Sequence, residues 1–493
     1  MKEIARLVVP ALRWDRSHGF RYLEGLIDDA LALGVGGFLV DGGPRDAVAA
    51  LIARLHAASA APILVAGHAE RGAGQGVDGL TGLPPLGALA SVAVVHPDGS
   101  ALPSLDADLV RRAARLTARE LRTVGMNWAL APVCDLDVAR GSARVGIRGA
   151  GNDPAVVAAV VSEWVDACQA ESVVACAMHF PGIGRMLDGA GIGVVKDAAA
   201  FLRTGDLVPF VAAIDAGAAS VMVAPVRVRS LGAPEGAMQS SALIENLLRT
   251  EMRFDGLVVT VPFDREPGFD VAREPATAVA AVVAGCDIVL APSDLSGVVD
   301  ALAAAAARGE LTVARVRDAV GRVDRWAGWG RPGVGVPARE ASLDDVMWSR
   351  QLADRCAHFV SGSRPRVGAT IEVVPVISAG VRASVADFGD TLRALHIEVT
   401  EAAEPGPRER SPLVVQFVPD NTVGDAVTRD ELDRARAFAV PASRAGRDTL
   451  IVAYCHPRIA AALGRDLSVL CAWEPSRVMQ QAAARALFTA SAR

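Results

Sequence analysis

The feature that most constrains this chain is the regular alternation of short apolar runs with longer amphipathic stretches along its N-terminal part. The runs are rich in β-branched residues, which favour strands, and the stretches between them have helical periodicity. Eight runs are expected to be strands: residues 7–12, 35–40, 62–66, 128–133, 173–178, 220–226, 256–261 and 286–291. Eight strands that alternate with helices predict an α/β fold, a (β/α)8 barrel of the TIM type.

A second, smaller domain is expected after the barrel. Glycine and proline cluster at 330–337, and we assign 1–329 to the barrel, 330–341 to a linker and 342–493 to the second domain. Within it, strands are expected at 372–377, 412–418, 449–454 and 468–473, and helices at 381–395, 429–439 and 477–488. This alternation predicts a doubly wound α/β domain.

Composition excludes several classes of function. The 493 residues are 51% hydrophobic, enough to bury two cores. Fifty basic and 56 acidic residues give a net charge of −6 without long runs of one sign, so neither nucleic acid nor an anionic membrane surface is an expected partner. The seven cysteines lack CxxC spacing and are expected to be reduced, which fits the cytoplasm. No membrane-spanning segment or signal peptide is expected.

In a barrel of this type the chemistry lies on the loops that follow the strands. Here these loops carry polar residues that include Asp41, His68, Glu70, Asp135, His179 and Asp264. Each of these groups, taken by itself, is explained better as a cap or a solvated loop residue than as a catalyst, because βα turns use such residues anyway. The loop at His179 stands out because Pro181, Gly182 and Gly184 shape it, although a satisfied core histidine beside a turn is the alternative.

The sequence motifs that could indicate a cofactor or metal site are either incomplete or absent. Residues 74–79 spell GxGxxG, but the sequence that follows, Leu-Thr-Gly-Leu-Pro-Pro, cannot open the helix that would hold a pyrophosphate. His68 and His179 lack the closely spaced companions of a zinc site. No GxSxG elbow or P-loop is present. We therefore expect neither a cofactor nor a metal.

Several segments together resemble glycoside hydrolase family 3, in particular its bacterial β-N-acetylglucosaminidase branch. They are HAERGAGQGVDGLTGLPPLGALAS (68–91), LAPVCDLDVARGSARVGIRGAGNDPAVVA (130–158), ACAMHFPGIGR (175–185), SVMVAPV (220–226) and RFDGLVVTVPF (253–263). Near the end, CAWEPSRVMQQAAARALF (471–488) is similar to the close of the α/β domain of many members. The resemblance covers the barrel and, more loosely, the second domain.

The resemblance implies a retaining glycosidase, which needs a carboxylate nucleophile and a proton donor on either side of the scissile bond. Val261 occupies the nucleophile's position, and its isopropyl group cannot attack carbon. The loop 187–192, where this branch carries its acid/base histidine, contains no histidine.

Sugar-binding positions of the family motifs are also altered. Met178, Ile183, Pro225 and His68 stand where the family has lysine, histidine, histidine and aspartate. The resemblance leaves four candidates for substrate binding: His68, Glu70, Arg148 and His179.

We therefore expect a family 3 protein of carbohydrate metabolism that is catalytically impaired or inactive and binds an amino sugar, a muropeptide-like ligand or a protein partner. One alternative is an active β-N-acetylhexosaminidase or β-glucosidase in which Asp264 or Asp188 replaces the nucleophile. A purely structural assembly protein is the other.

Overall fold

The computed structural model of the chain describes residues 2–95, 104–139, 141–187, 192–265, 270–331, 333–379, 381, 384–405, 411–420, 427–464 and 466–488. These residues form two compact units. The first comprises 1–81, 93–136 and 149–342, and the second comprises 82–92, 137–148 and 343–493. Two short segments from the N-terminal part of the chain therefore belong with the C-terminal residues, which the sequence pattern did not indicate.

The first unit is the expected parallel barrel. Seven strands lie in the order β12-β10-β8-β7-β4-β3-β2, and β1 pairs with β13. The ring closes because β1 precedes β2 by one residue and because Ile288, next to β13, bridges Val259 of β12. The strand bounds are β1 (Val8–Val9), β2 (Ala11–Arg13), β3 (Gly37–Asp41), β4 (Leu64–His68), β7 (Trp128–Leu130), β8 (Val174–Phe180), β10 (Ser220–Val223), β12 (Leu257–Thr260) and β13 (Val289–Leu290).

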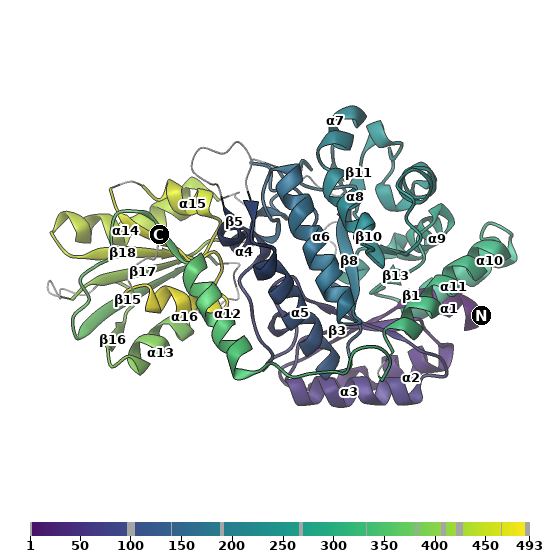
Figure 1. The fold of residues 1–493 in the computed structure, drawn as a ribbon, viewed down its shortest axis with the longest axis horizontal. Coiled ribbons are helices and arrows are strands. Elements are labelled where there is room, and N and C mark those ends of the chain that lie inside the picture. The colour runs from purple at the N-terminus through teal and green to yellow at the C-terminus, as the bar shows by residue number, and fades with distance from the viewer. Residues whose placement is uncertain are drawn as a thin grey trace. The chain divides into compact units, whose positions relative to one another are not determined.

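Helices follow the strands of the barrel, as Figure 1 shows for α5, α6 and α8. Their bounds are α1 (Lys2–Ala5), α2 (Glu24–Leu33), α3 (Arg45–Ala58), α5 (Ala107–Thr123), α6 (Pro154–Ala170), α7 (Ala199–Thr204), α8 (Val208–Asp215), the π-helical η6 (Ala242–Glu251), α9 (Glu274–Ala284), α10 (Leu295–Ala307) and α11 (Val313–Trp329). Asp153 caps α6 by accepting hydrogen bonds from the amides of Ala155 and Val156. Four short strands, β5 (Val94–Val95), β6 (Ser104–Leu105), β9 (Gly193–Val194) and β11 (Val226–Arg227), pair outside the barrel.

A chain of hydrogen bonds crosses the barrel interior. The indole of Trp128 donates to the Ser220 hydroxyl over 2.9 Å, and that hydroxyl donates to the carbonyl of Ala175, also over 2.9 Å. Each polar atom therefore has a partner although all three residues are fully buried.

A buried carboxylate joins the amino-terminal ends of β12 and β13. Asp287 is fully buried and accepts from Arg249 over 2.6 Å, from Arg315 over 2.7 Å and from the amide of Val258 over 2.9 Å. Both arginine side chains are themselves largely buried. The three charges depend on one another, because a buried charge without a partner is costly.

The second unit is the smaller doubly wound domain. Its sheet has the order β14-β19-β18-β17-β15-β16, parallel except for the edge strand β14. The strands are β14 (His358–Ser361), β15 (Thr370–Ile377), β16 (Glu398–Glu401), β17 (Leu413–Val418), β18 (Thr449–Ala453) and β19 (Ser468–Cys471). Helices lie on both faces of the sheet (Figure 1). They are α12 (Leu343–Cys356), α13 (Ala386–Ala394), α14 (Arg429–Arg444), α15 (Pro457–Ala462) and α16 (Arg477–Arg485), with α4 (Leu86–Ala93) contributed by the segment 82–92.

Helix α14 begins with a capping box that buries a carboxylate. Glu431 accepts from the amide and the hydroxyl of Thr428, both over 2.9 Å, from the amide of Asp420 over 2.8 Å and from the hydroxyl of Ser378 over 2.9 Å. Burial alone would raise the pKa of Glu431, but these hydrogen bonds outweigh it and lower the pKa to about 2. The ionised carboxylate therefore ties α14 to the ends of β15 and β17.

Glu431→Gln should make the second unit less stable in a pH-dependent way. A carboxylate whose pKa is lowered by folding stabilises the protein above the unfolded value of 4.5, and this contribution is lost as the pH falls toward 2. We expect the substitution to lower the unfolding free energy by about 2 kcal/mol at neutral pH, and by less than half of that near pH 3. Urea unfolding followed by circular dichroism at both pH values measures this, with Glu398→Gln on the exposed face of β16 as the control. An equal loss at both pH values would contradict the assignment.

Candidate functional site

The candidate site lies at the carboxyl ends of the barrel strands. Arg13 ends β2, Asp41 ends β3 and His68 ends β4, while His179 is the penultimate residue of β8. Arg13 and Asp41 are direct neighbours in the strand register, and His68 is paired with Leu130 of β7. Parallel strands place all their carboxyl ends at one mouth, so these side chains share one end of the barrel.

His179 is held by a buried aspartate, Asp135, in the segment that follows the neighbouring strand β7. Its Nδ1 lies 2.8 Å from Asp135 Oδ2, and its amide donates to the same oxygen over 3.2 Å. The other oxygen of Asp135 accepts from the amide of Ile183 over 2.8 Å. Asp135 is fully buried and His179 is 9% exposed. The contact of Nδ1 with Asp135 and the backbone hydrogen bond to the same oxygen together fix the orientation of the imidazole.

A second buried carboxylate supports the same loop. Arg185 Nε donates to Asp206 Oδ2 over 2.8 Å, and Asp206 lies so close to Gly182 that a side-chain carbon there would be 3.1 Å from its Cβ. Burial raises the pKa of Asp206, although Arg185 acts in the opposite direction. Asp206 lies between α7 and α8, where no strand ends nearby in the sequence, so the sequence pattern did not indicate its place beside Gly182.

Of the four substrate-binding candidates, three lie in the barrel unit. These are His68, Glu70 and His179. Glu70 lies in the loop after β4, where its backbone forms an isolated β-bridge with Gly72. Arg148 belongs to the second unit, in the segment 137–148, and donates to the carbonyl of Arg144 over 3.0 Å. In the same segment Asp137 bonds to His456 over 2.9 Å and to both terminal nitrogens of Arg458.

Val261 directly follows β12 and is 3% exposed. The hydroxyl of Thr260 donates to the carbonyl of Val261 over 2.9 Å and accepts from the amide of Leu290 over 3.0 Å, which fixes the backbone at this point. A hydrocarbon side chain therefore occupies the end of this strand. Met178 and Ile183, the apolar residues of the His179 segment, are also buried.

Asp264, three residues further on, is held by an arginine. Arg13 donates to both carboxylate oxygens of Asp264, over 2.8 Å each, and to Asp41 over 2.5 Å. Arg265 lies 3.2 Å from Asp41. Burial alone would lower the pKa of Arg13, but the two aspartates raise it above its ordinary value. The sequence placed Asp41 and Asp264 at the mouth but missed Arg13, although it ends a predicted strand. Asp188 lies outside the described residues.

Among the described ranges, no group of three or more histidine, cysteine, aspartate or glutamate side chains is arranged to hold a metal ion. All seven cysteines are free and buried. In the same part of the chain, no helix is both long and apolar enough to cross a membrane.

Comparisons with known proteins relate the barrel to glycosyl hydrolase family 3. Residues 31–326 match the profile of the glycosyl hydrolase family 3 N terminal domain. A beta-hexosaminidase of Xylella fastidiosa is 35% identical over 303 residues, which are 60% of this chain and 85% of that protein. One from Xanthomonas campestris is 36% identical over 249 residues, 50% of this chain and 72% of the relative. Among solved structures, a family 3 beta-N-acetylglucosaminidase from Paenibacillus superposes over 99% of this chain and 96% of its own, with a TM-score of 0.80 at 22% identity.

Proposed function

The chain belongs to glycosyl hydrolase family 3, and from that premise we propose that it binds an amino sugar or a muropeptide-like ligand without hydrolysing it. In this proposal the protein is a pseudoenzyme of carbohydrate metabolism. His68, Glu70 and His179 at the barrel mouth hold the ligand, whereas Arg148, the fourth candidate, belongs to the second unit and is not part of this proposed site. A reducing compartment such as the cytoplasm fits the seven buried free thiols.

The observation that carries the proposal is Val261 at the end of β12. Retaining hydrolysis needs a carboxylate that attacks the anomeric carbon and an acid/base about 5 Å away. A valine can neither form the covalent intermediate nor stabilise positive charge on the sugar. Because Val261 is 3% exposed and its backbone is fixed by Thr260, a carboxylate from elsewhere has no room at this position without displacing it.

The alternative is an active hexosaminidase with rearranged groups, which the activity of the named relatives favours. Asp264 is the described carboxylate nearest in sequence to Val261. Both of its oxygens accept hydrogen bonds from Arg13, so an attack by Asp264 on a sugar would have to break a bidentate ion pair. We therefore favour binding over turnover.

The test is calorimetry of the full-length protein with N-acetylglucosamine and an anhydromuropeptide-type ligand, beside an assay with an aryl N-acetyl-β-glucosaminide. We expect saturable binding and no turnover. His179→Asn should weaken binding on the order of tenfold, because it removes a hydrogen-bonding imidazole from the site. His396→Asn, at an exposed position of the second unit, is the matched control and should bind as the wild type does. Turnover that His179→Asn abolishes would overturn the proposal.

A further inference from the structure

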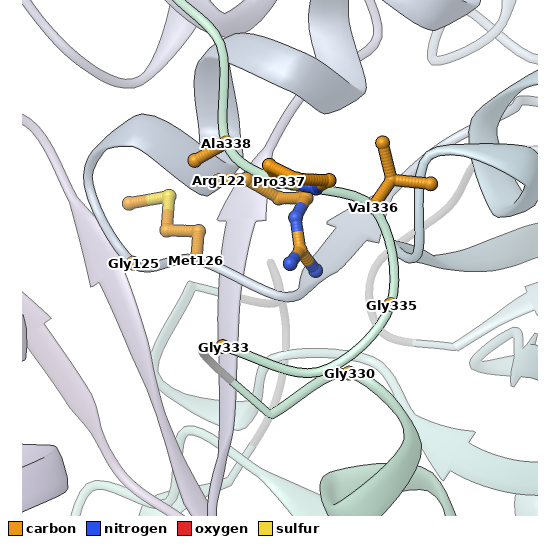
Figure 2. Close-up of a pocket in the computed structure, with 9 residues that line it drawn as sticks. All are labelled: Arg122, Gly125, Met126, Gly330, Gly333, Gly335, Val336, Pro337 and Ala338. Atoms are coloured by element: carbon orange, nitrogen blue, oxygen red, sulfur yellow. The ribbon is translucent and has the colours of Figure 1, made fainter.

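A cavity of about 340 Å³ lies at the amino-terminal end of β7, at the end of the barrel opposite the mouth. One wall is the end of α5 and the turn after it, with Arg122, Gly125 and Met126. The other wall is the loop that follows α11, which contributes Gly330, Gly333 and 335–338. Figure 2 shows this loop curving around the guanidinium of Arg122. All these residues belong to the barrel unit.

Hydrogen bonds and one close glycine contact hold this loop against the rest of the barrel unit. The amide of Val336 donates to the hydroxyl of Ser172 over 3.1 Å, and the carbonyls of Ser172 and Val334 accept from Arg122 over 3.0 Å each. Gly335 has a φ of +76°, and a side-chain carbon there would lie 2.2 Å from the Ser172 hydroxyl. Only glycine can therefore bring the loop this close to Ser172.

Arg122 brings a charge to the cavity that the protein itself does not neutralise. Its two terminal nitrogens reach only backbone carbonyls, and among the described residues its buried Nε has no hydrogen-bond partner and no carboxylate lies within ion-pair distance. Burial lowers the pKa of Arg122, and the more distant charge of Glu171 offsets this only in part. Each terminal nitrogen of Arg122 carries two hydrogens, so one hydrogen on each remains for a further acceptor.

We propose that this cavity binds a small organic anion, with a carboxylate or phosphate group on Arg122 and a short apolar part against Met126, Val336 and Pro337. The four glycines that line the cavity leave backbone at its surface, so a compact anion can approach it closely. The carboxyl end of α5 opposes an anion with only about half a unit charge. Arg331 adds a second full positive charge on this side, near His56 and Gly125.

This site is independent of the sugar site, and its test does not depend on activity. We expect sodium butyrate or sodium phosphate at about 10 mM to raise the melting temperature of the full-length protein by on the order of 2 °C, relative to sodium chloride of equal ionic strength. A response to butyrate alone identifies a carboxylate ligand, and a response to phosphate alone identifies a phosphate ligand. No response to either probe overturns the proposal.

Two variants locate the effect. Arg122→Gln should abolish the anion-dependent shift, whereas Arg308→Gln, which removes an exposed arginine paired with Glu310, should keep it. If Arg122→Gln fails to fold, Ala338→Trp provides the same test, because a large side chain at this exposed position fills the cavity. A shift that survives both Arg122→Gln and Ala338→Trp would place the bound anion elsewhere and contradict the assignment.

Discussion

Replacing Val261 with aspartate should give the protein a hydrolytic activity that the wild type lacks. The substrate should be an N-acetyl-β-glucosaminide with a dinitrophenyl leaving group, because this group departs without a proton and the missing acid/base then matters little. We expect Val261→Asp to release dinitrophenol at least about 100-fold faster than the wild type, since a carboxylate at this position can form the covalent intermediate.

The pH profile and a matched variant make this result specific. The introduced carboxyl replaces a side chain that is only 3% exposed, so burial should raise its pKa and the rate should increase with pH as it ionises. Val261→Asn has nearly the same shape and cannot form a stable glycosyl ester, so it should stay at the wild-type rate. If both variants fold, bind N-acetylglucosamine and remain equally inactive, the missing carboxylate is not the reason why the wild type does not hydrolyse the substrate.

The largest expected loss of stability follows from Asp287→Asn. The aspartate neutralises Arg249 and Arg315, whose side chains are only 9% and 14% exposed, and it also accepts from the amide of Val258. Removing its charge deprives the largely buried Arg249 of this ion pair and leaves Arg315 with the exposed Asp318 as its carboxylate partner. Breaking a buried pair of this kind costs on the order of 3 to 5 kcal/mol of unfolding free energy, which should appear as a lower urea midpoint.

Asp318→Asn is the control for this prediction. Asp318 also pairs with Arg315, over 3.3 Å, but it is 53% exposed, and an exposed ion pair contributes under about 1 kcal/mol. A loss from Asp287→Asn that is no larger than the loss from Asp318→Asn would show that the buried network does not stabilise the barrel.

The sequence predicted the barrel well because its strands are buried on both faces and therefore read as short apolar runs. Residues 173–178 predicted β8, and every residue of that strand is buried. The same reasoning missed β14 and β16, which are four-residue edge strands of the second sheet with no buried residue. Their pairing depends on neighbours along the sheet and leaves no apolar pattern in the sequence.

The sequence predicted where the candidate site lies better than it predicted the hydrogen bonds and ion pairs within it. Strand ends could be counted, so His68, His179 and Val261 were placed at the mouth. Partners remote in sequence, such as Asp135 for His179 and Arg13 for Asp264, are 44 and 251 residues away and appear only when the strands are assembled. The sequence also gave no indication that Arg148 packs with the C-terminal unit, because nothing in the segment 137–148 distinguishes it from a barrel loop.

The most direct test of the account is intact-protein mass spectrometry after incubation with a fluorinated N-acetylglucosaminyl fluoride, a reagent that traps the glycosyl intermediate of retaining enzymes. We expect the wild type to keep its mass of 51.0 kDa, since Val261 offers no carboxylate for the sugar, while Val261→Asp gains the mass of one sugar. A stoichiometric sugar adduct on the wild type, mapped by peptide sequencing to Asp264, Asp188 or any other side chain, would show that the barrel still performs retaining hydrolysis.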